Sequence, residues 1–432
     1  MSGLVIHRAK WVVPVTSSVI EDGAVAVFHD KIADVGRTQD ILTRFHGKII
    51  DHDSAILCPG LVNCHTHLEL SGLHMRLSPT SSFSRWVTNM LEAKENLSEQ
   101  DEENAVKNAI SGLKNEGVIA IGDIGNSTIA AAMLAESHSI DICVFFQEII
   151  CLKRQDAPDL NAMDMGMKNL EHDGFLATIA PHACYSVFPE LLRAIKGLCN
   201  GRKRPFSIHA AESEEEITFL ASGTGPMRTF LEKKGKWPLE FHIPKTSPIR
   251  HLHHLGVLDA NTICVHCVHI DDNDLNLLAS SRATACLCPR SNLFLGSGIP
   301  PAAALVSRGV PIALGTDSLA SNDKLSIFAE MSSLARLTPE MPSETIFRAA
   351  TLGGAKALKL SDRIGSLEPE KKADFLLIRT ENCKTAQEVY DFLIHYTPSD
   401  TGKETMQWVS PILNPQERAN GLLRASSGAS FE

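Results

Sequence analysis

Short apolar runs alternate with amphipathic segments through the middle of the chain. Eight such runs occur, at residues 55–63, 117–126, 141–150, 175–186, 205–213, 262–271, 283–292 and 311–322. Near-continuous apolar strands that alternate with helices predict a parallel sheet buried on both faces. Eight units within one domain predict an α/β protein with a (β/α)8 TIM barrel, which typically needs roughly 250 residues. An open doubly wound sheet is disfavoured because no GxGxxG motif follows the first strand.

The two ends of the chain have a different pattern. Alternating, strand-like segments lie at residues 4–13 and 23–36, and strand character returns at 371–378 and 404–410. Strands from both termini predict a small β-sandwich-like module. We therefore expect this module to comprise residues 1–55 plus 365–432, and the barrel to comprise residues 56–364.

The amphipathic segments between the runs predict helices that end at glycine. Residues 102–117, 189–201 and 300–310 each carry a glycine near the position where a helix C-terminus favours one.

Charge and composition narrow the class of protein. The chain has 41 Lys and Arg against 51 Asp and Glu, a formal charge of −10, which argues against a general nucleic-acid binder. No secretory signal and no run of about eighteen apolar residues is found, so we expect a cytoplasmic protein without a membrane partner. Eleven cysteines, several within apolar runs, predict buried free thiols rather than disulfides. A homo-oligomer remains possible.

Polar residues gather where the predicted strands end, which is where the active site of such a barrel lies. They are His65 and His67 after the first run, His209 and Glu212 toward the end of the fifth, His266 in the sixth and Asp317 in the eighth. Because alternate residues of a strand project to the same side, His65 and His67 can reach one metal ion together. Buried imidazoles and carboxylates are costly without partners, so their joint placement predicts a shared divalent cation and a small-molecule substrate.

The motifs PGLVNCHTHLE, HAAES, VHCVHID and LGTDSLASN, in this order and at these separations, resemble the amidohydrolase superfamily. The resemblance is to the branch of cytosine deaminase-like and chlorohydrolase-like enzymes, and it extends over nearly the whole chain. One departure is Glu370, where the family usually has glycine before lysine; this affects a surface turn.

The resemblance implies four metal ligands, His65, His67, His209 and Asp317. Members with two metals usually bridge them with a carbamylated lysine at the end of strand four, where this chain reads Ala180-Pro181-His182-Ala183-Cys184. One metal ion is therefore expected. Zinc is favoured, although ferrous iron and manganese also tolerate mixed nitrogen and oxygen ligands.

The residue types beside the metal suggest a mechanism. Three imidazoles and a carboxylate leave a divalent metal an open position for water, whose pKa it lowers toward neutrality. Asp317 can accept the water proton, His266 can stabilise the attacking oxygen, and Glu212 can protonate a ring nitrogen. The next three glutamates, at residues 214–216, are expected to form the solvated acidic first turn of a helix.

Three further residues are candidates for substrate binding. His182 ends strand four and can bond the substrate, or it is a core histidine. Trp86 can cover the substrate ring, or it packs a helix. Arg290 can meet a substrate carboxylate or phosphate, or it forms an ion pair inside the barrel. Arg85 and Arg228 are weaker versions of the same idea.

Three longer strings around these motifs, HAAESEEEITFLASGTGPMRTFL, CPRSNLFLGSGIPP and LGTDSLASNDKLS, resemble branch members that deaminate adenosine derivatives. The first candidate reaction converts 6-aminodeoxyfutalosine, of menaquinone synthesis, to futalosine and ammonia, and it is preferred slightly because Arg290 offers a partner for an aromatic carboxylate. S-adenosylhomocysteine or methylthioadenosine is the second candidate substrate. Guanine or a chlorinated triazine, an amide or imide ring, and a catalytically inactive structural barrel remain alternatives.

Overall fold

The computed structural model describes residues 3–127, 129–137, 140–172, 174–237, 242–398 and 405–410. The C-terminal segment 419–432, in which the sequence shows no motif, lies outside the described residues. The chain divides into two compact units. The first comprises Met1–Gly60, Ser361–Phe392 and Pro398–Glu432, and the second comprises Leu61–Leu360 and Leu393–Thr397.

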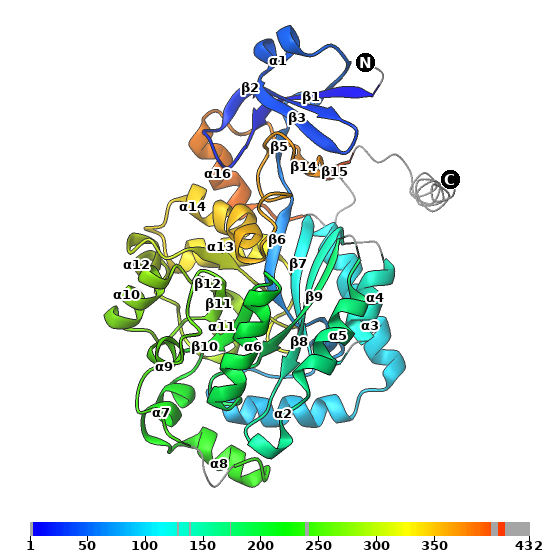
Figure 1. Ribbon diagram of the computed structural model, residues 1–432. Helices are drawn as coiled ribbons and strands as arrows, with labels where there is room; N and C mark the ends of the chain where they lie inside the picture. The colour runs from blue at the N-terminus through cyan, green and yellow to red at the C-terminus, as the bar shows by residue number, and fades with distance from the viewer. Residues whose placement is uncertain are drawn as a thin grey trace, which may run out of the picture. The chain divides into compact units, whose positions relative to one another are not determined.

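The first unit is built on one seven-stranded sheet (Figure 1). Its strands are β1 (Leu4–Val12), β2 (Ile20–Phe28), β3 (Lys31–Arg37), β4 (Lys48–Asp51), β5 (Ile56–Pro59), β14 (Phe375–Ile378) and β15 (Met406–Val409). The order is β15-β14-β5-β1-β2-β3, with β4 also paired to β1. The strands expected at both termini are thus confirmed, but they form one sheet rather than the separate sheets of a sandwich. The reason is β1, which pairs with β2 along one edge and with β4 and then β5 along the other.

Apolar side chains cover both faces of this sheet. Val25 and Val27 of β2 belong to one buried cluster, which also contains Phe375. The alternate residue Ala26 belongs to the other cluster, together with Ile41 of helix α1 (Thr38–Arg44). Because successive strand residues point to opposite faces, the nearly continuous apolar sequence of β2 matches a strand buried on both sides.

The second unit is an α/β structure with two four-stranded parallel sheets (Figure 1). One contains β6 (Leu61–Thr66), β7 (Val118–Gly125), β8 (Ile142–Ile149) and β9 (Phe175–Pro181); the other contains β10 (Phe206–Ala210), β11 (Thr262–His266), β12 (Thr284–Leu287) and β13 (Ile312–Leu314). Each of the eight apolar runs contains one of these strands. The first run divides at Gly60, so that β5 belongs to the first unit and β6 to the second. Isolated parallel bridges join Thr66 to Asp317 and Ala183 to His209.

Helices follow the strands. They are α2 (Phe83–Glu95), α3 (Glu99–Asn115), α4 (Ile129–Ser137), α5 (Leu160–Leu170), α6 (Pro189–Gly201), α7 (Glu214–Ser222), α8 (Pro226–Lys233), α9 (Pro248–His254), α10 (Asp272–Ser281), α11 (Pro289–Leu295), α12 (Ala302–Ser307), α13 (Ile327–Leu337), α14 (Ser343–Arg348), α15 (Gly354–Ala357) and α16 (Ala386–His395). None of the helices in the described ranges has the length and apolar content needed to cross a membrane.

A glycine lies at or near the end of all three predicted helices. Gly117 after α3 and Gly309 after α12 have positive φ angles of 77° and 75°. Helix α6 ends at Gly201 itself, and the left-handed residue that follows it is Lys203, with φ 55°.

The eleven cysteines are all buried and free, as their apolar surroundings predicted. Burial raises the pKa of the Cys199 and Cys288 thiols to about 11. These thiols are therefore protonated near neutral pH and pack as small apolar side chains.

Candidate metal centre and active site

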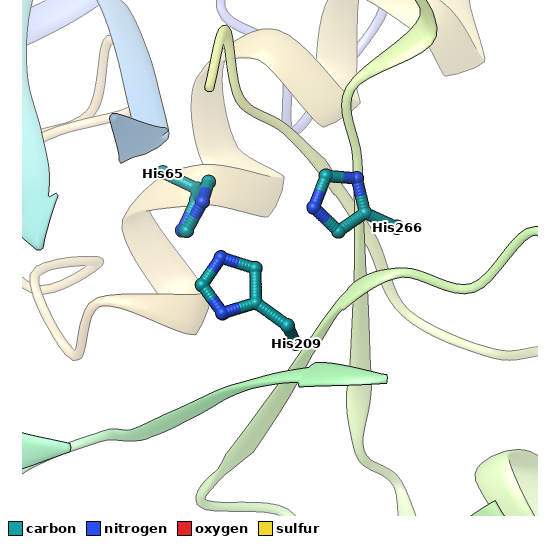
Figure 2. A group of neighbouring side chains, drawn as sticks. All are labelled: His65, His209 and His266. Carbon is teal, nitrogen blue, oxygen red and sulfur yellow. The ribbon is translucent and has the colours of Figure 1, made fainter. Parts of the chain in front are cut away.

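The carboxyl ends of the parallel strands bring the predicted metal-binding residues together. Two overlapping groups have ligand atoms within 4.8 Å of one another, one formed by His65, His67 and Asp317 and the other by His65, His209 and His266. Figure 2 shows the rings of His65, His209 and His266 around a common space. Residues separated by up to 252 positions along the chain thus meet at one place, as the strand-end argument predicted.

The spacing of these atoms suits a small divalent cation. His67 Nε2 lies 3.4 Å from His209 Nε2. Asp317 Oδ1 lies 3.7 Å from His67 Nε2 and 4.0 Å from His65 Nε2. Ligands bound tetrahedrally to zinc at about 2.0–2.1 Å stand about 3.4 Å apart. The four side chains need only small adjustments to share one ion.

His65 carries the clearest sign of a missing partner. This histidine is fully buried, and neither its Nδ1 nor its Nε2 has a hydrogen-bond partner among the described residues. Burial lowers the pKa of His65 well below its usual value, so the ring is neutral and offers a nitrogen lone pair. A buried polar atom without a partner is costly, and coordination to a cation removes that cost.

Neighbouring groups orient two of the other ligands. His209 Nδ1 donates to the backbone oxygen of His182 at 2.8 Å, which leaves Nε2 directed at His67. Asp317 Oδ2 accepts hydrogen bonds from Ser291 Oγ (2.5 Å) and Ser321 Oγ (2.9 Å), which leaves Oδ1 facing the histidines. Such outer contacts fix the orientation of metal ligands.

Glu212 and His266 face each other beside this cluster. Glu212 Oε1 lies 3.5 Å from His266 Nε2, and His266 Nδ1 donates to Asn292 Oδ1 at 2.9 Å. Burial raises the pKa of Glu212 well above its usual value, and the charges of Asp317 and Glu216 raise it further. Burial lowers the pKa of His266. Both shifts favour the uncharged forms, a protonated carboxyl group beside a neutral imidazole, and a carboxyl group in that form can donate a proton.

Strained backbone accompanies these residues. Ala211, His266, Cys267 and Asp317 have φ angles of 56°, 75°, 50° and 56°, in the left-handed region that non-glycine residues rarely adopt. All four lie at or just beyond the ends of β10, β11 and β13. Strain of this kind costs roughly 1–3 kcal/mol per residue and gathers at functional sites.

The expected solvated turn at residues 214–216 was wrong for two of its three residues. Glu216 is buried, and its Oε2 accepts the backbone N–H of Glu212 at 2.8 Å; burial raises its pKa to about 7. Glu215 accepts hydrogen bonds from Ser82 Oγ (2.8 Å) and the Ser84 N–H (3.0 Å) at the start of α2. The first turn of α7 therefore holds both the backbone of Glu212 and the start of α2 in place.

A cavity of about 540 Å³ opens onto the cluster. His182 and Trp86 line it, as expected of substrate-binding residues, and Trp86 Nε1 also donates to the Ala320 oxygen at 3.3 Å. Its apolar wall includes Phe83, Trp86, Met90, Met227, Phe230 and Leu231. Four lysines also line the cavity: Lys94, which pairs with Glu69, and Lys153, Lys234 and Lys236.

Arg290 does not line this cavity. Its guanidinium binds Asp323 and lies 3.1 Å from Asn322 Oδ1 and 3.8 Å from Glu330 Oε1. The geometry therefore corresponds to the ion-pair alternative and not to a substrate contact. Arg85 and Arg228 are also absent from the lining residues.

Sequence reasoning missed several polar residues of the site, of which Glu148 is the most informative. It ends β8 within the apolar run DICVFFQEII and lines the cavity beside His182 and His209. A charged residue in the last positions of an otherwise apolar strand is the signal that identified the other site residues. Applied to the third strand, the same rule would have found Glu148.

Comparison with known proteins identifies the family. The model of the amidohydrolase family matches residues 56–404. A 5-methylthioadenosine/S-adenosylhomocysteine deaminase of Pelotomaculum thermopropionicum is 29% identical over 371 residues, which cover 83% of this chain and 81% of that protein.

Solved structures of the same fold include two deaminases. The Helicobacter pylori aminofutalosine deaminase in complex with methylthio-coformycin has a TM-score of 0.79 and 25% identity, covering 91% of this chain and 96% of that one. A Xanthomonas campestris adenosine deaminase with bound zinc has a TM-score of 0.77 and 24% identity, covering 98% and 97%, and its similarity concerns the fold alone.

Proposed function

This chain belongs to the amidohydrolase family, and we propose that it is a metal-dependent hydrolytic deaminase of an adenosine derivative. The observation that carries the proposal is the buried carboxyl group of Glu212, whose pKa burial raises, beside a cluster of imidazoles in which both nitrogen atoms of His65 lack partners. Relatives named as deaminases support a reaction at a carbon–nitrogen bond. The bridges Thr66–Asp317 and Ala183–His209 support a closed (β/α)8 barrel for the second unit, with the first unit as an accessory β-module.

His65, His67, His209 and Asp317 would hold one divalent cation. Zinc suits three neutral imidazoles and one carboxylate, and ferrous iron and manganese are alternatives. A bound cation would supply a water molecule that is ionised near neutral pH. One ion is proposed because no lysine lies in the segment 180–184 at the end of β9.

Proton transfer falls to three side chains. Glu212, whose protonated form burial favours, would donate to a ring nitrogen of the purine and so make the adjacent amino-bearing carbon electrophilic. Asp317 Oδ1 would accept the proton of the attacking water. His266, held by Asn292, would stabilise the oxygen as it adds to the ring. The proton taken up by Asp317 would then leave with ammonia, and the proton of the added hydroxyl group would return to Glu212 as the carbonyl group forms.

Two features of the cavity bear on the substrate. Its apolar wall favours a nucleoside with an apolar 5′ extension, as in methylthioadenosine and in aminodeoxyfutalosine. Lys153, Lys234 and Lys236 favour an extension that ends in a carboxylate, which supports aminodeoxyfutalosine for a reason other than Arg290. The names of the sequence relatives support methylthioadenosine or S-adenosylhomocysteine instead.

A substrate panel tests the proposal. Zinc-loaded protein is incubated with adenosine, methylthioadenosine, S-adenosylhomocysteine, aminodeoxyfutalosine, guanine and a chlorinated triazine. We expect ammonia release and the spectral change from adenine to hypoxanthine with at least one adenosine derivative, and neither after chelation. Release of chloride from the triazine, or of ammonia from guanine alone, would move the assignment to that reaction. If the protein carries its full complement of metal and forms no product from any of these compounds, the alternative of a catalytically inactive structural barrel would be supported.

A further inference from the structure

Glu148 presents an unpaired carboxylate oxygen at the cavity. The side chain is 5% exposed, and Oε1 has no hydrogen-bond partner in the part of the chain that the structure describes. Oε1 lies 4.0 Å from His209 Nδ1, outside hydrogen-bond distance. A buried carboxylate oxygen in this condition is costly unless a ligand supplies a donor.

The rest of the carboxylate is held in place. Oε2 accepts a hydrogen bond from Asn126 Nδ2 at 3.0 Å. Asn126 is fixed in turn, because its N–H donates to Glu69 Oε2 (3.0 Å) and its oxygen accepts from Gln147 Nε2 (2.9 Å). These bonds orient Glu148 before any ligand binds, and preorganised polar groups lose little freedom on binding.

Glu148, His182 and His209 lie close enough for a second metal ion, but their bonding argues against one. His209 Nδ1 already donates to the His182 oxygen, and its Nε2 faces the first cluster. His209 therefore has no nitrogen left for another ion. Two ligands remain, whereas protein metal sites usually supply three or four.

The remaining pair suits a hydroxyl group. His182 Nδ1 bonds Ser186 Oγ at 2.9 Å, which leaves Nε2 for a ligand. The ligand atoms of Glu148 and His182 lie within 4.8 Å of each other. A single hydroxyl with two bonds of about 2.8 Å at a tetrahedral angle spans about 4.5 Å between its partners, and it can donate to the carboxylate while bonding the imidazole.

We propose that Glu148, with His182 beside it, binds a sugar hydroxyl of the substrate, so that the site selects ribonucleosides over deoxynucleosides. This inference rests on the proposed function. In a purine nucleoside the sugar is attached on the opposite side of the ring system from the amino group. Glu148 is likewise separated from the metal cluster by the imidazole ring of His209.

The inference is tested by comparing the wild type and one variant on a series of substrates. The kcat/KM values for adenosine, 2′-deoxyadenosine and 3′-deoxyadenosine are measured for the wild type and for Glu148→Gln. For the wild type we expect at least one deoxynucleoside to be roughly 10- to 100-fold poorer than adenosine, as for a lost hydrogen bond to a charged group. Glu148→Gln should lower the value for adenosine by a similar factor and leave that for the disfavoured deoxynucleoside nearly unchanged.

Glu190→Gln is the matched control, because Glu190 is half exposed and pairs with Arg154 away from the cavity. It should leave all three values unchanged. If Glu148→Gln lowers all three values by one common factor, Glu148 has a structural role and the inference is wrong. Equal wild-type values for the three nucleosides also overturn it, while the deaminase proposal stands.

Binding measurements separate the inference from catalysis. Titration calorimetry of zinc-loaded protein with inosine, 2′-deoxyinosine and 3′-deoxyinosine requires no turnover. Preference for inosine that Glu148→Gln abolishes supports the inference even if no nucleoside is deaminated, in which case the proposed function alone fails. Equal binding of the three nucleosides, or binding of none, overturns the inference.

Discussion

Each unit of this protein contains a group of neighbouring histidines, but the two groups differ in how their nitrogen atoms are used. In the first unit, His7 Nδ1 lies 3.0 Å from His52 Nε2, and the rings are stacked within 3° of parallel. In the second unit, the rings of His65 and His67 meet at 84°, and both nitrogen atoms of His65 lack partners. In the first arrangement the two histidines are hydrogen-bond partners of each other, whereas His65 in the second requires a group from outside the described residues.

The difference shows that burial alone does not mark a metal site. Burial is the largest cause of the lowered pKa of both His7 and His65. What separates them is the carboxylate that the cluster surrounds and the contacts that fix its orientation. Asp317, held by Ser291 and Ser321, turns one oxygen toward His65 and His67. No equivalent carboxylate contact is found for His7 among the described residues.

The largest expected effect comes from removing one imidazole of the cluster. His209→Ala should abolish binding of the divalent metal, because it removes a ligand that the His182 oxygen holds in place. Deamination should fall by roughly a thousandfold or more, since a catalytic metal contributes several kcal/mol. Elemental analysis together with the ammonia assay measures both effects.

The matched control takes a histidine from the other set. His7→Phe should keep the full metal content and the wild-type rate. If both variants lose the metal to the same extent, the two groups of histidines do not differ in their role in metal binding. Full metal retention by His209→Ala would exclude this residue as a ligand.

Glu212→Gln should have the next largest effect. Glutamine preserves the shape of the side chain beside His266 but cannot donate the ring proton. The metal should remain, while deamination falls by roughly a hundredfold or more, as is usual when general acid–base catalysis is lost. Metal content and rate are measured on the same preparation. If the metal is lost together with the activity, Glu212 is a ligand or a structural support instead of an acid.

The strands of both units could be predicted from sequence because their signal is local. Apolar runs bounded by turn residues identified all eight parallel strands, and alternation identified the terminal strands. The sandwich-like arrangement was wrong because sheet continuity depends on pairing between distant segments, such as β1 with β5. Local pattern does not encode that register.

The candidate site could likewise be predicted where its signal is local, and not where it depends on distant partners. His65, His209 and Asp317 stand out because polar residues at the ends of apolar strands are locally visible. Glu216 was misread as solvated because the rule for acidic first turns does not consider a neighbouring backbone N–H, that of Glu212, which donates to Glu216. The sequence left two alternatives open for Arg290, because its ion-pair partner Asp323 lies beyond the end of another strand.

The smallest effect is expected from the hydrogen-bonded pair His7 and His52, and it concerns stability rather than catalysis. Burial, followed by the charge of His52, lowers the pKa of His7 to about 4, whereas an unfolded histidine titrates near 6.5. Between these values the unfolded chain binds more protons, so this contribution to stability is complete above pH 6.5 and is lost as the pH falls toward 4. By pH 5 the loss relative to pH 7 is about 2 kcal/mol. The lowered pKa of His52 acts in the same direction.

Replacing both rings isolates this contribution from the other titrating groups. His7→Phe combined with His52→Phe retains aromatic packing near Phe375, which His7 meets edge-on at 5.6 Å between ring centroids. Urea unfolding at pH 7 and pH 5 should show a smaller loss of stability on acidification for the double variant than for the wild type, with metal content and rate at pH 7 unchanged. If the two proteins lose stability equally, the pair does not titrate between these pH values. A lower metal content in the double variant would show that the stacked pair is coupled to the cluster, and the two histidine sets would then not be independent.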